Sequence, residues 1–284
     1  MNEKYAVDPV AFNSALEFRY LLEKFGFDQG RFLAEYPKKW RKMLFDHIVT
    51  LPDVEQMRIK RVLECRADRS MLRMGLPYDS GRSWVENAVD KKAAGLFTEV
   101  FAGKGSGLLT LHDIDDEQLA DSRGVRVVAT AKNLLAVAEP LLQCSMEVFL
   151  IDPYITLGKP RYLEFFQALL ASPHAKDTGF VFFARNEHFV CKESPEHIAQ
   201  RELLPYMQMG SSARFVSLND NRQMHGRYMF SIKGALKYDK GFQVDGHTLV
   251  DIEVVSKNIH DEYFTLYHDR EHEFDIVGDF TVRK

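Results

Sequence analysis

The alternation of short apolar runs with amphipathic segments after Arg123 constrains the fold of this 284-residue chain most strongly. Apolar runs at 125–129, 147–151, 179–184 and 213–218 are separated by helix-like segments at 131–145, 161–171 and 195–209. Strands joined by helices predict a largely parallel sheet with right-handed crossovers. Further runs at 224–232, 235–244 and 249–256 follow with short turns, which is typical of β-hairpins. We therefore predict an α/β domain over residues 125–284, with a mixed sheet flanked by helices.

The first part of the chain has a different pattern. Apolar residues recur at helical spacing around 12–21, 43–48 and 57–63, which predicts a helical domain over residues 1–107. The glycine-rich run at 102–107 falls where this pattern stops, and it lacks the spacing of a Walker phosphate loop. We interpret it as flexible chain and assign residues 108–124 to a linker.

Charge is distributed unevenly along the chain. Residues 1–110 contain 18 Lys and Arg against 15 Asp and Glu, whereas the remainder contains 19 against 26. A basic cluster around one aromatic residue is a candidate nucleic-acid-binding surface, made of Lys38, Lys39, Trp40, Arg41 and Lys42. The alternative is that Trp40 anchors the core and the lysines around it are solvated.

Several classes of protein are not indicated by the composition. The three cysteines are widely separated, with no metal-ligand spacing, so we expect no metal, no cofactor and no disulfide framework. The start of the sequence has neither a basic leader nor an apolar run, and no stretch is apolar for long enough to span a membrane. These features predict a cytoplasmic protein without a membrane span.

His225 and Arg227 are the strongest candidates for chemistry. They open the apolar run 224–232, and residues two apart on a strand point to the same face. A histidine beside a cation suits phosphate chemistry, because imidazole is a nucleophile or proton carrier near neutral pH and arginine binds phosphate through its planar fork. A structural role for the pair is the alternative.

The order of elements around this motif resembles the phospholipase D-like superfamily. A strand ends in Asp152-Pro-Tyr154, two helix–strand units follow, and His225-x-Arg227 opens a hairpin whose second strand carries Tyr238-Asp239. The likeness is to its single-motif branch, including the C-terminal domains of microtubule-interacting and transport proteins, and it covers about the last 160 residues. In active members, one motif histidine attacks phosphorus, a second protonates the leaving oxygen, and no metal is needed.

The resemblance implies roles for individual residues. His225 would be the nucleophile, and Arg227 would replace the lysine that binds phosphate. Ile232 stands where the motif has aspartate, and Phe242 stands where the neighbouring strand has a small hydroxyl residue. Candidate residues for binding around the same pocket are Asp152, Tyr154, Asp239, Ser256 and Asn258. For Asp152, a strand-terminating turn is the alternative.

Only one such motif is present, so a catalytic site would require a homodimer that shares two copies of His225. We expect a phosphodiester-handling protein, either a metal-independent nuclease or a nuclease-derived subunit of a microbial DNA-processing or antiviral defence system. The alternative is a catalytically inactive module that binds phosphate or nucleic acid within a larger complex, with a protein partner docked through residues 1–107.

Overall fold

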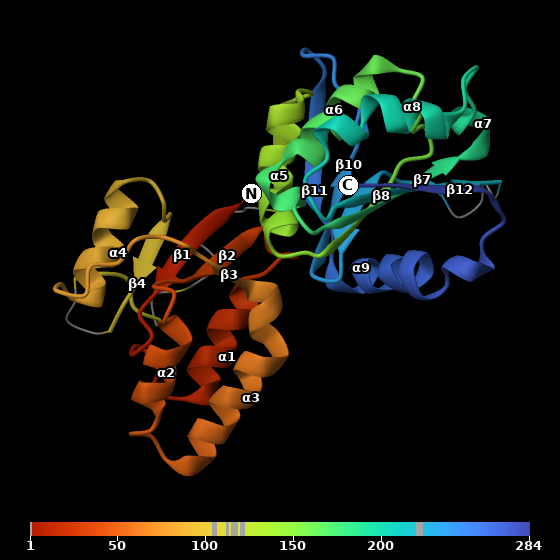
Figure 1. The fold of residues 1–284 in the computed structure, drawn as a ribbon. Helices are drawn as coiled ribbons and strands as arrows, with labels where there is room; N and C mark the ends of the chain where they lie inside the picture. The colour runs from red at the N-terminus through yellow and green to blue at the C-terminus, as the bar shows by residue number, and fades with distance from the viewer. Residues whose placement is uncertain (1, 104–106, 112–113, 115–118, 120–122, 220–223) are drawn as a thin grey trace. The chain divides into compact units, whose positions relative to one another are not determined.

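The computed structural model describes all residues except 1, 104–106, 112–113, 115–118, 120–122 and 220–223 (Figure 1). The chain forms two compact units, Met1–Arg123 and Gly124–Lys284. Each unit combines helices with its own β-sheet, so the α/β fold class is confirmed. The predicted glycine-rich linker and the segment after it fall partly outside the described residues.

The first unit contains a parallel four-stranded sheet in the order β3-β2-β1-β4. Its strands are β1 (Glu3–Val7), β2 (Arg31–Glu35), β3 (Met71–Arg73) and β4 (Glu99–Phe101). The helices of this unit are α1 (Ala15–Lys24), α2 (Trp40–Ile48), α3 (Asp53–Ser70) and α4 (Trp84–Ala93). Chain order reverses between β1 and β4, which distributes the crossover helices over both faces of the sheet.

Two apolar clusters cover the faces of this sheet. Tyr5 and Val7 of β1 pack with α1, α2 and α3, whereas Ala6 points to the opposite face and packs with α4. This alternation is the two-residue period of a strand. The four strands are thus held by helices on both sides.

The prediction of a helical domain for residues 1–107 is therefore wrong in one respect. Its predicted helices exist as α1, α2 and α3, but the four strands between them were missed. These strands are three to five residues long, and β2 is buried along its whole length. Such short runs give no alternating pattern, because a parallel strand covered on both faces is apolar on both sides.

The second unit contains the predicted strands and helices in the predicted order. Its strands are β5 (Gly124–Val128), β6 (Glu147–Ile151), β7 (Gly179–Arg185), β8 (Ser212–Leu218), β9 (Tyr228–Ser231), β10 (Gly234–Tyr238), β11 (Leu249–Val254) and β12 (Ile276–Arg283). Its helices are α5 (Ala131–Gln143), α6 (Pro160–Ala171), α7 (Asn186–Phe189), α8 (Pro195–Glu202) and α9 (Lys257–Phe264). Strand β12 and the helices α7 and α9 were not predicted.

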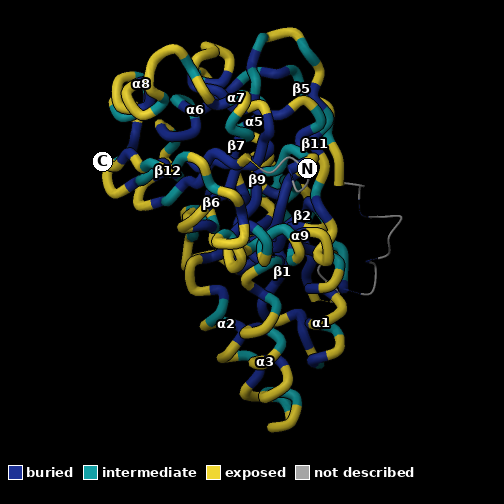
Figure 2. Tube along the Cα trace, turned by 90° about the vertical axis from the view of Figure 1, so that its right-hand side faces the viewer, coloured by how far each residue is buried: buried dark blue, intermediate teal, exposed yellow. Residues whose placement is uncertain are grey.

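The eight strands form one mixed sheet in the order β12-β8-β7-β6-β9-β10-β11-β5. Strands β6, β7 and β8 are parallel, and β9 pairs antiparallel with β6. Helices α5, α6 and α8 cover one face and α9 covers the other (Figure 1). Figure 2 shows the central strands β6, β7 and β9 as buried and the outer side of α8 as exposed.

Aromatic side chains fill both faces of the second sheet. Phe182 of β7 packs on Phe166 of α6 and on Phe215 of β8, with ring centroids 4.8 and 4.5 Å apart. On the opposite face, Phe149 stacks on Phe230 at 5.0 Å, and Phe264 of α9 covers them. Phe149 and Phe230 are directly opposite each other on β6 and β9, so their stacking stabilises the register in which these two strands meet.

The loop before β11 gives a pH-dependent contribution to stability. The Asp245 carboxylate accepts hydrogen bonds from the backbone of His247 and Thr248 and from the Thr248 hydroxyl, and these donors hold its pKa well below the usual value. A native pKa below the unfolded value means that the stabilisation is present above about pH 4 and is lost as pH falls through the native value.

We expect Asp245→Ala to lower the melting temperature by a few degrees at pH 7, because the loop loses these bonds. The difference from wild type should shrink steadily as the pH is lowered below about 4, in thermal unfolding followed by circular dichroism. If the difference in melting temperature between wild type and Asp245→Ala stays constant from pH 7 to pH 2.5, this assignment is wrong.

Candidate functional site

Part of the predicted site meets at one edge of the second sheet: Asp152, Tyr154, Arg227 and Asp239. Asp152 directly follows β6, and Arg227 directly precedes β9. Because these two strands are antiparallel, with Ile151 opposite Tyr228, the end of one lies beside the start of the other. Asp239 follows β10 at the same edge. The fold thereby brings together segments separated by more than 70 residues in the sequence.

Arg227 is held by two acceptors at this edge. Its Nη1 donates to the carbonyl oxygen of Asp239 at 2.5 Å, and its Nε lies 3.6 Å from Oδ1 of Asp152. The guanidinium also lies over the ring of Tyr154, 5.0 Å from the ring centroid. The side chain is 30% exposed, and its Nη2 has no hydrogen-bond partner among the described residues. One face of a fixed cation therefore remains open to solvent.

Asp152 is fully buried beneath Arg227. Its carboxylate accepts from the Tyr154 backbone N–H at 2.9 Å, from the Tyr162 hydroxyl at 3.2 Å and from the Phe242 backbone N–H at 3.4 Å. Burial raises the pKa of this carboxyl group, and the donors and Arg227 oppose that shift. Asp152 thus terminates β6, as the turn interpretation predicted, and also pairs with Arg227.

Gly241 makes this arrangement sterically possible. Its φ is +74°, and a Cβ at this position would lie 2.2 Å from Oδ2 of Asp152 and 2.7 Å from Cδ of Arg227. No side chain fits at those distances, and the left-handed conformation favours glycine in addition. Asp152, Arg227 and Gly241 therefore form one closely packed unit.

His225 is exposed and lies outside the strand. The expectation that His225 and Arg227 project from one face of a strand is wrong, because β9 begins only at Tyr228. The backbone on one side of the histidine is held by Arg185, whose Nη2 donates to the carbonyl oxygen of Met224 at 2.9 Å. No hydrogen-bond partner contacts the His225 imidazole within the described part of the chain. The ring is therefore exposed to solvent, and no carboxylate of the described residues orients it.

Ser256 and Asn258 are not part of this arrangement. Both are exposed at the start of α9, where the neighbouring His260 contacts the carbonyl of Ser231 at the far end of β9. Because β9, β10 and β11 run antiparallel in turn, the chain that leaves β11 continues toward the end of β9 and away from its start. The assignment of Ser256 and Asn258 to the His225 pocket is therefore wrong. Asp239 contributes its carbonyl to Arg227, while its carboxylate accepts from the Asp251 N–H at 2.9 Å.

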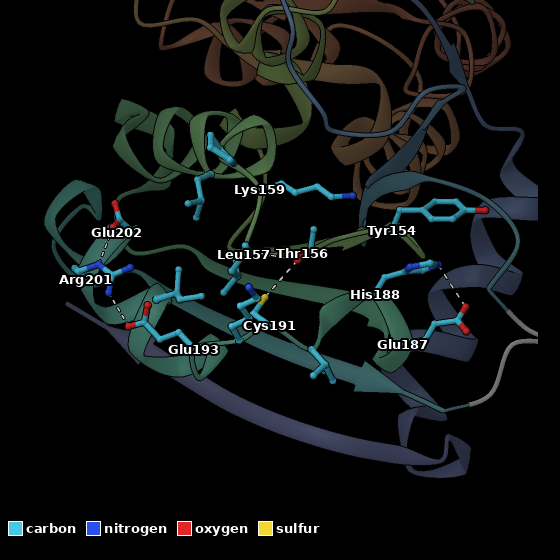
Figure 3. Close-up of a pocket in the computed structure, with 16 residues that line it drawn as sticks. Tyr154, Thr156, Leu157, Lys159, Glu187, His188, Cys191, Glu193, Arg201 and Glu202 are labelled. Atoms are coloured by element: carbon cyan, nitrogen blue, oxygen red, sulfur yellow. Dashed lines mark hydrogen bonds and ion pairs between the residues drawn. The ribbon is translucent and has the colours of Figure 1, made fainter.

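A pocket of about 720 Å³ adjoins Tyr154 (Figure 3). The loop after β6 and the segment after β7 form its walls, which places it at the carboxyl edge of the parallel strands. Tyr154 lies beside His188 with ring centroids 4.9 Å apart, and both line the pocket. Lys159 lies near this aromatic end, and Arg201 with Glu193 and Glu202 lies at the other end (Figure 3).

Part of the predicted basic surface of the first unit is buried or engaged in ion pairs. Trp40 is fully buried, and its indole N–H donates to the carbonyl of Val7 at 2.8 Å, so the prediction that Trp40 stacks on a base is wrong. Arg41 forms an ion pair with Glu35, and Lys42 lies 2.8 Å from Asp46. Lys38 and Lys39 are exposed. The indole belongs to the core because it is the largest apolar group of its segment.

Sequence reasoning missed several residues of this site. Tyr162 lies within the helix predicted at 161–171 and was not a candidate. Arg185, at the end of β7, was not a candidate either, and neither were His188 and Gly241. The positions of polar residues immediately after predicted parallel strands, such as Arg185 to His188, were a signal that could have pointed to the pocket.

Among the described residues, no group of three or more His, Cys, Asp or Glu side chains converges in a way that could hold a metal ion. No helix of the described ranges combines the length and apolar character required to cross a membrane.

Comparisons with known proteins give weak likenesses. No protein-family model and no curated protein matches this sequence. Among solved structures, TrmBL2, an archaeal chromatin protein with a novel mode of DNA binding, is similar at 9% identity and a TM-score of 0.29, over 58% of this chain and 57% of that one. Polyphosphate kinase from Porphyromonas gingivalis is similar at 9% identity and a TM-score of 0.34, over 93% and 44%.

The chain thus spans about half the length of these neighbours. Both TM-scores are below 0.5, so neither likeness indicates a function for this chain.

Proposed function

We propose that the second unit recognises a phosphate group of nucleic acid through Arg227 and His225. The observation that carries the proposal is the fixed orientation of Arg227 by Asp152 and the Asp239 carbonyl, with Nη2 left open among the described residues and an exposed histidine two positions earlier in the chain. An arginine whose orientation is fixed in advance loses little conformational entropy when it binds an anion. It also offers directed hydrogen bonds rather than a diffuse positive charge.

Binding without cleavage is the form of this function that the geometry supports best. A nucleophilic histidine is ordinarily oriented by a hydrogen bond to its second ring nitrogen, and His225 has no such partner among the described residues. The residues expected to complete a catalytic motif, Ser256 and Asn258, lie at the other edge of the sheet. These two facts favour a recognition module derived from an enzyme.

A metal-independent nuclease is the second candidate. The exposure of His225 beside Arg227 supports it, because a second copy of the chain would be able to bring its own histidine to the same phosphate. This candidate requires a homodimer. A role in DNA processing or antiviral defence is part of the same proposal.

Arg227→Ala is expected to weaken binding of a labelled oligonucleotide about 10- to 100-fold, the usual value of a charge-assisted hydrogen bond to phosphate. The slope of log K against log salt should also flatten by about 0.7 for one lost contact with a single strand. Fluorescence anisotropy at several salt concentrations measures both quantities. Arg283→Ala is the matched control, since Arg283 ends β12 at the opposite edge of the sheet.

Incubation of the same oligonucleotides in EDTA separates the two candidates. We expect wild type to bind without cleaving, and His225→Ala to bind a few-fold more weakly than wild type without cleaving. If wild type cleaves the oligonucleotide and His225→Ala does not, the nuclease replaces the recognition module as the proposed function. Equal affinity of wild type and Arg227→Ala would remove this site from nucleic-acid binding altogether.

A further inference from the structure

The ion pairs of the pocket next to Tyr154 leave its two lysines without a carboxylate partner among the described residues. Three Lys or Arg and three Glu line it, and each Glu has an arginine neighbour: Arg201 lies 2.6 Å from Glu193 and 2.8 Å from Glu202, and Arg185 lies 3.8 Å from Glu187. The side-chain ammonium groups of Lys159 and Lys192 have no ion pair or hydrogen bond with a described residue. Two uncommitted ammonium groups in a concave site favour an anionic ligand.

The end of the pocket nearest Arg227 is aromatic. Tyr154 is 41% exposed, and its ring centroid lies 5.0 Å from the Arg227 guanidinium and 4.9 Å from the centroid of the His188 ring. The rings of Tyr154 and His188 are inclined at 39°, and the His188 side chain is 38% exposed. Exposed rings beside cations are the usual surface on which nucleic-acid bases stack.

The same pocket has an apolar floor. Leu157 is almost fully buried, Ile198 is 5% exposed, and both contribute to its lining together with Leu163. Apolar lining with a few charged groups is typical of sites that bury a flat organic ring while binding its charged substituent at the rim. Lys159 extends along the pocket toward Tyr154, so the charged and aromatic features converge at the end nearest Arg227 (Figure 3).

We propose that this pocket holds an unpaired nucleotide that is covalently continuous with the phosphate at Arg227, so that the ligand of the site is single-stranded nucleic acid. This inference rests on the proposed function and adds the substrate class to it. The base stacks against His188 and Tyr154, and Lys159 and Lys192 neutralise the backbone of the same strand. A base inside a duplex is paired and stacked on its neighbours, so it cannot enter the pocket without being unpaired.

The test compares a labelled single strand with a duplex of the same sequence on the full chain. Lys159→Ala/Lys192→Ala should weaken single-strand binding about tenfold or more and flatten the salt slope by about 1.4, at about 0.7 for each lost phosphate contact. His188→Ala should weaken single-strand binding about tenfold with little change in the slope, because stacking carries no charge. Wild type should prefer the single strand.

The control for lost charge is Lys176→Ala/Lys284→Ala. Lys176 lies just before β7 and Lys284 just after β12, next to Ser211, both at the edge of the sheet opposite the pocket. This variant should bind both ligands like wild type. If the control variant loses as much single-strand affinity as the Lys159/Lys192 variant, the loss reflects net charge alone and the proposal is overturned.

The outcomes distinguish the inference from the function on which it rests. If Arg227→Ala weakens binding but the Lys159/Lys192 and His188 variants do not, the phosphate site stands and the nucleotide pocket is rejected. If wild type binds duplex as tightly as single strand, the ligand class is wrong. If wild type binds neither, or Arg227→Ala has no effect, the proposed function itself fails.

Cys191 gives an independent readout within the pocket. It lines the cavity, and its Sγ lies 3.4 Å from the Thr156 hydroxyl oxygen. In a Cys65→Ser/Cys144→Ser background, we expect a saturating single strand to slow alkylation of Cys191 about tenfold, whereas duplex should leave the rate unchanged. Unchanged alkylation with the single strand bound would place the strand elsewhere and overturn the proposal.

Discussion

Asp152→Ala is expected to lower the free energy of unfolding by about 3 kcal/mol, as is usual when one partner of a buried charge pair is removed. Asp152 is fully buried, and its removal leaves Arg227, the Tyr162 hydroxyl and the Phe242 N–H without their acceptor. Equilibrium urea unfolding followed by circular dichroism measures the loss. Binding of the oligonucleotide should fall as well, because Arg227 is then held by the Asp239 carbonyl alone.

A double-mutant cycle separates positioning from general damage. Arg227 is 30% exposed, so Arg227→Ala alone should cost about 1 kcal/mol. Once Arg227 is gone, removing Asp152 no longer leaves an unpaired cation, so the double variant should be more stable than the sum of the single losses implies. Strict additivity would show that Asp152 does not position Arg227. The Asp152→Asn variant, which keeps an acceptor for the Tyr154 N–H, should lose less than Asp152→Ala.

Trp40→Ala should destabilise the first unit by about 3–5 kcal/mol, the usual loss for a large aromatic residue in a core. Trp40 is fully buried, and its ring packs against both Phe12 and Phe18 at centroid distances of 6.4 and 6.5 Å. The truncation creates a cavity and leaves the Val7 carbonyl without its indole donor. Fluorescence of Trp84, the second tryptophan of the chain, reports the urea unfolding of this unit.

Trp40→Phe is the matched control for the cavity. It keeps a ring in the core and removes the indole N–H, so we expect a smaller loss of about 1–2 kcal/mol. Lys38→Glu/Lys39→Glu alters exposed charges of the same segment and should leave stability within about 0.5 kcal/mol of wild type. Trp40→Ala with wild-type stability and weakened nucleic-acid binding would restore the surface-stacking hypothesis that the buried position contradicts.

The same Lys38/Lys39 variant tests the remaining part of the basic surface. Arg41 and Lys42 form ion pairs with carboxylates. Lys38 and Lys39 are exposed, and neither side chain forms an ion pair with a described residue. If the second unit carries the recognition, this variant should bind oligonucleotide like wild type. A loss as large as that of Arg227→Ala would assign a share of binding to the first unit.

The sequence predicted the elements of the second unit because its patterns are local. The apolar run 147–151 coincides with β6, and the helix predicted at 161–171 differs from α6 by one residue. Strand β9 is shorter than the run that predicted it, since residues 224–227 approach the sheet without joining it. In the first unit, helical spacing found α1, α2 and α3, but strands of three to five residues buried on both faces carry no period of their own.

For the site, the sequence by itself determined which residue types were available: His225 and Arg227 two positions apart, and Asp152 at the end of an apolar run. The tertiary structure alone decided which of them meet. Antiparallel pairing of β6 with β9 brings Asp152 to Arg227, and the antiparallel order β9-β10-β11 carries Ser256 and Asn258 to the opposite edge. Strand direction and register depend on contacts between distant segments, whereas periodicity and turn chemistry depend on near neighbours. That difference is why the sequence predicted the elements and only the fold assembled the site.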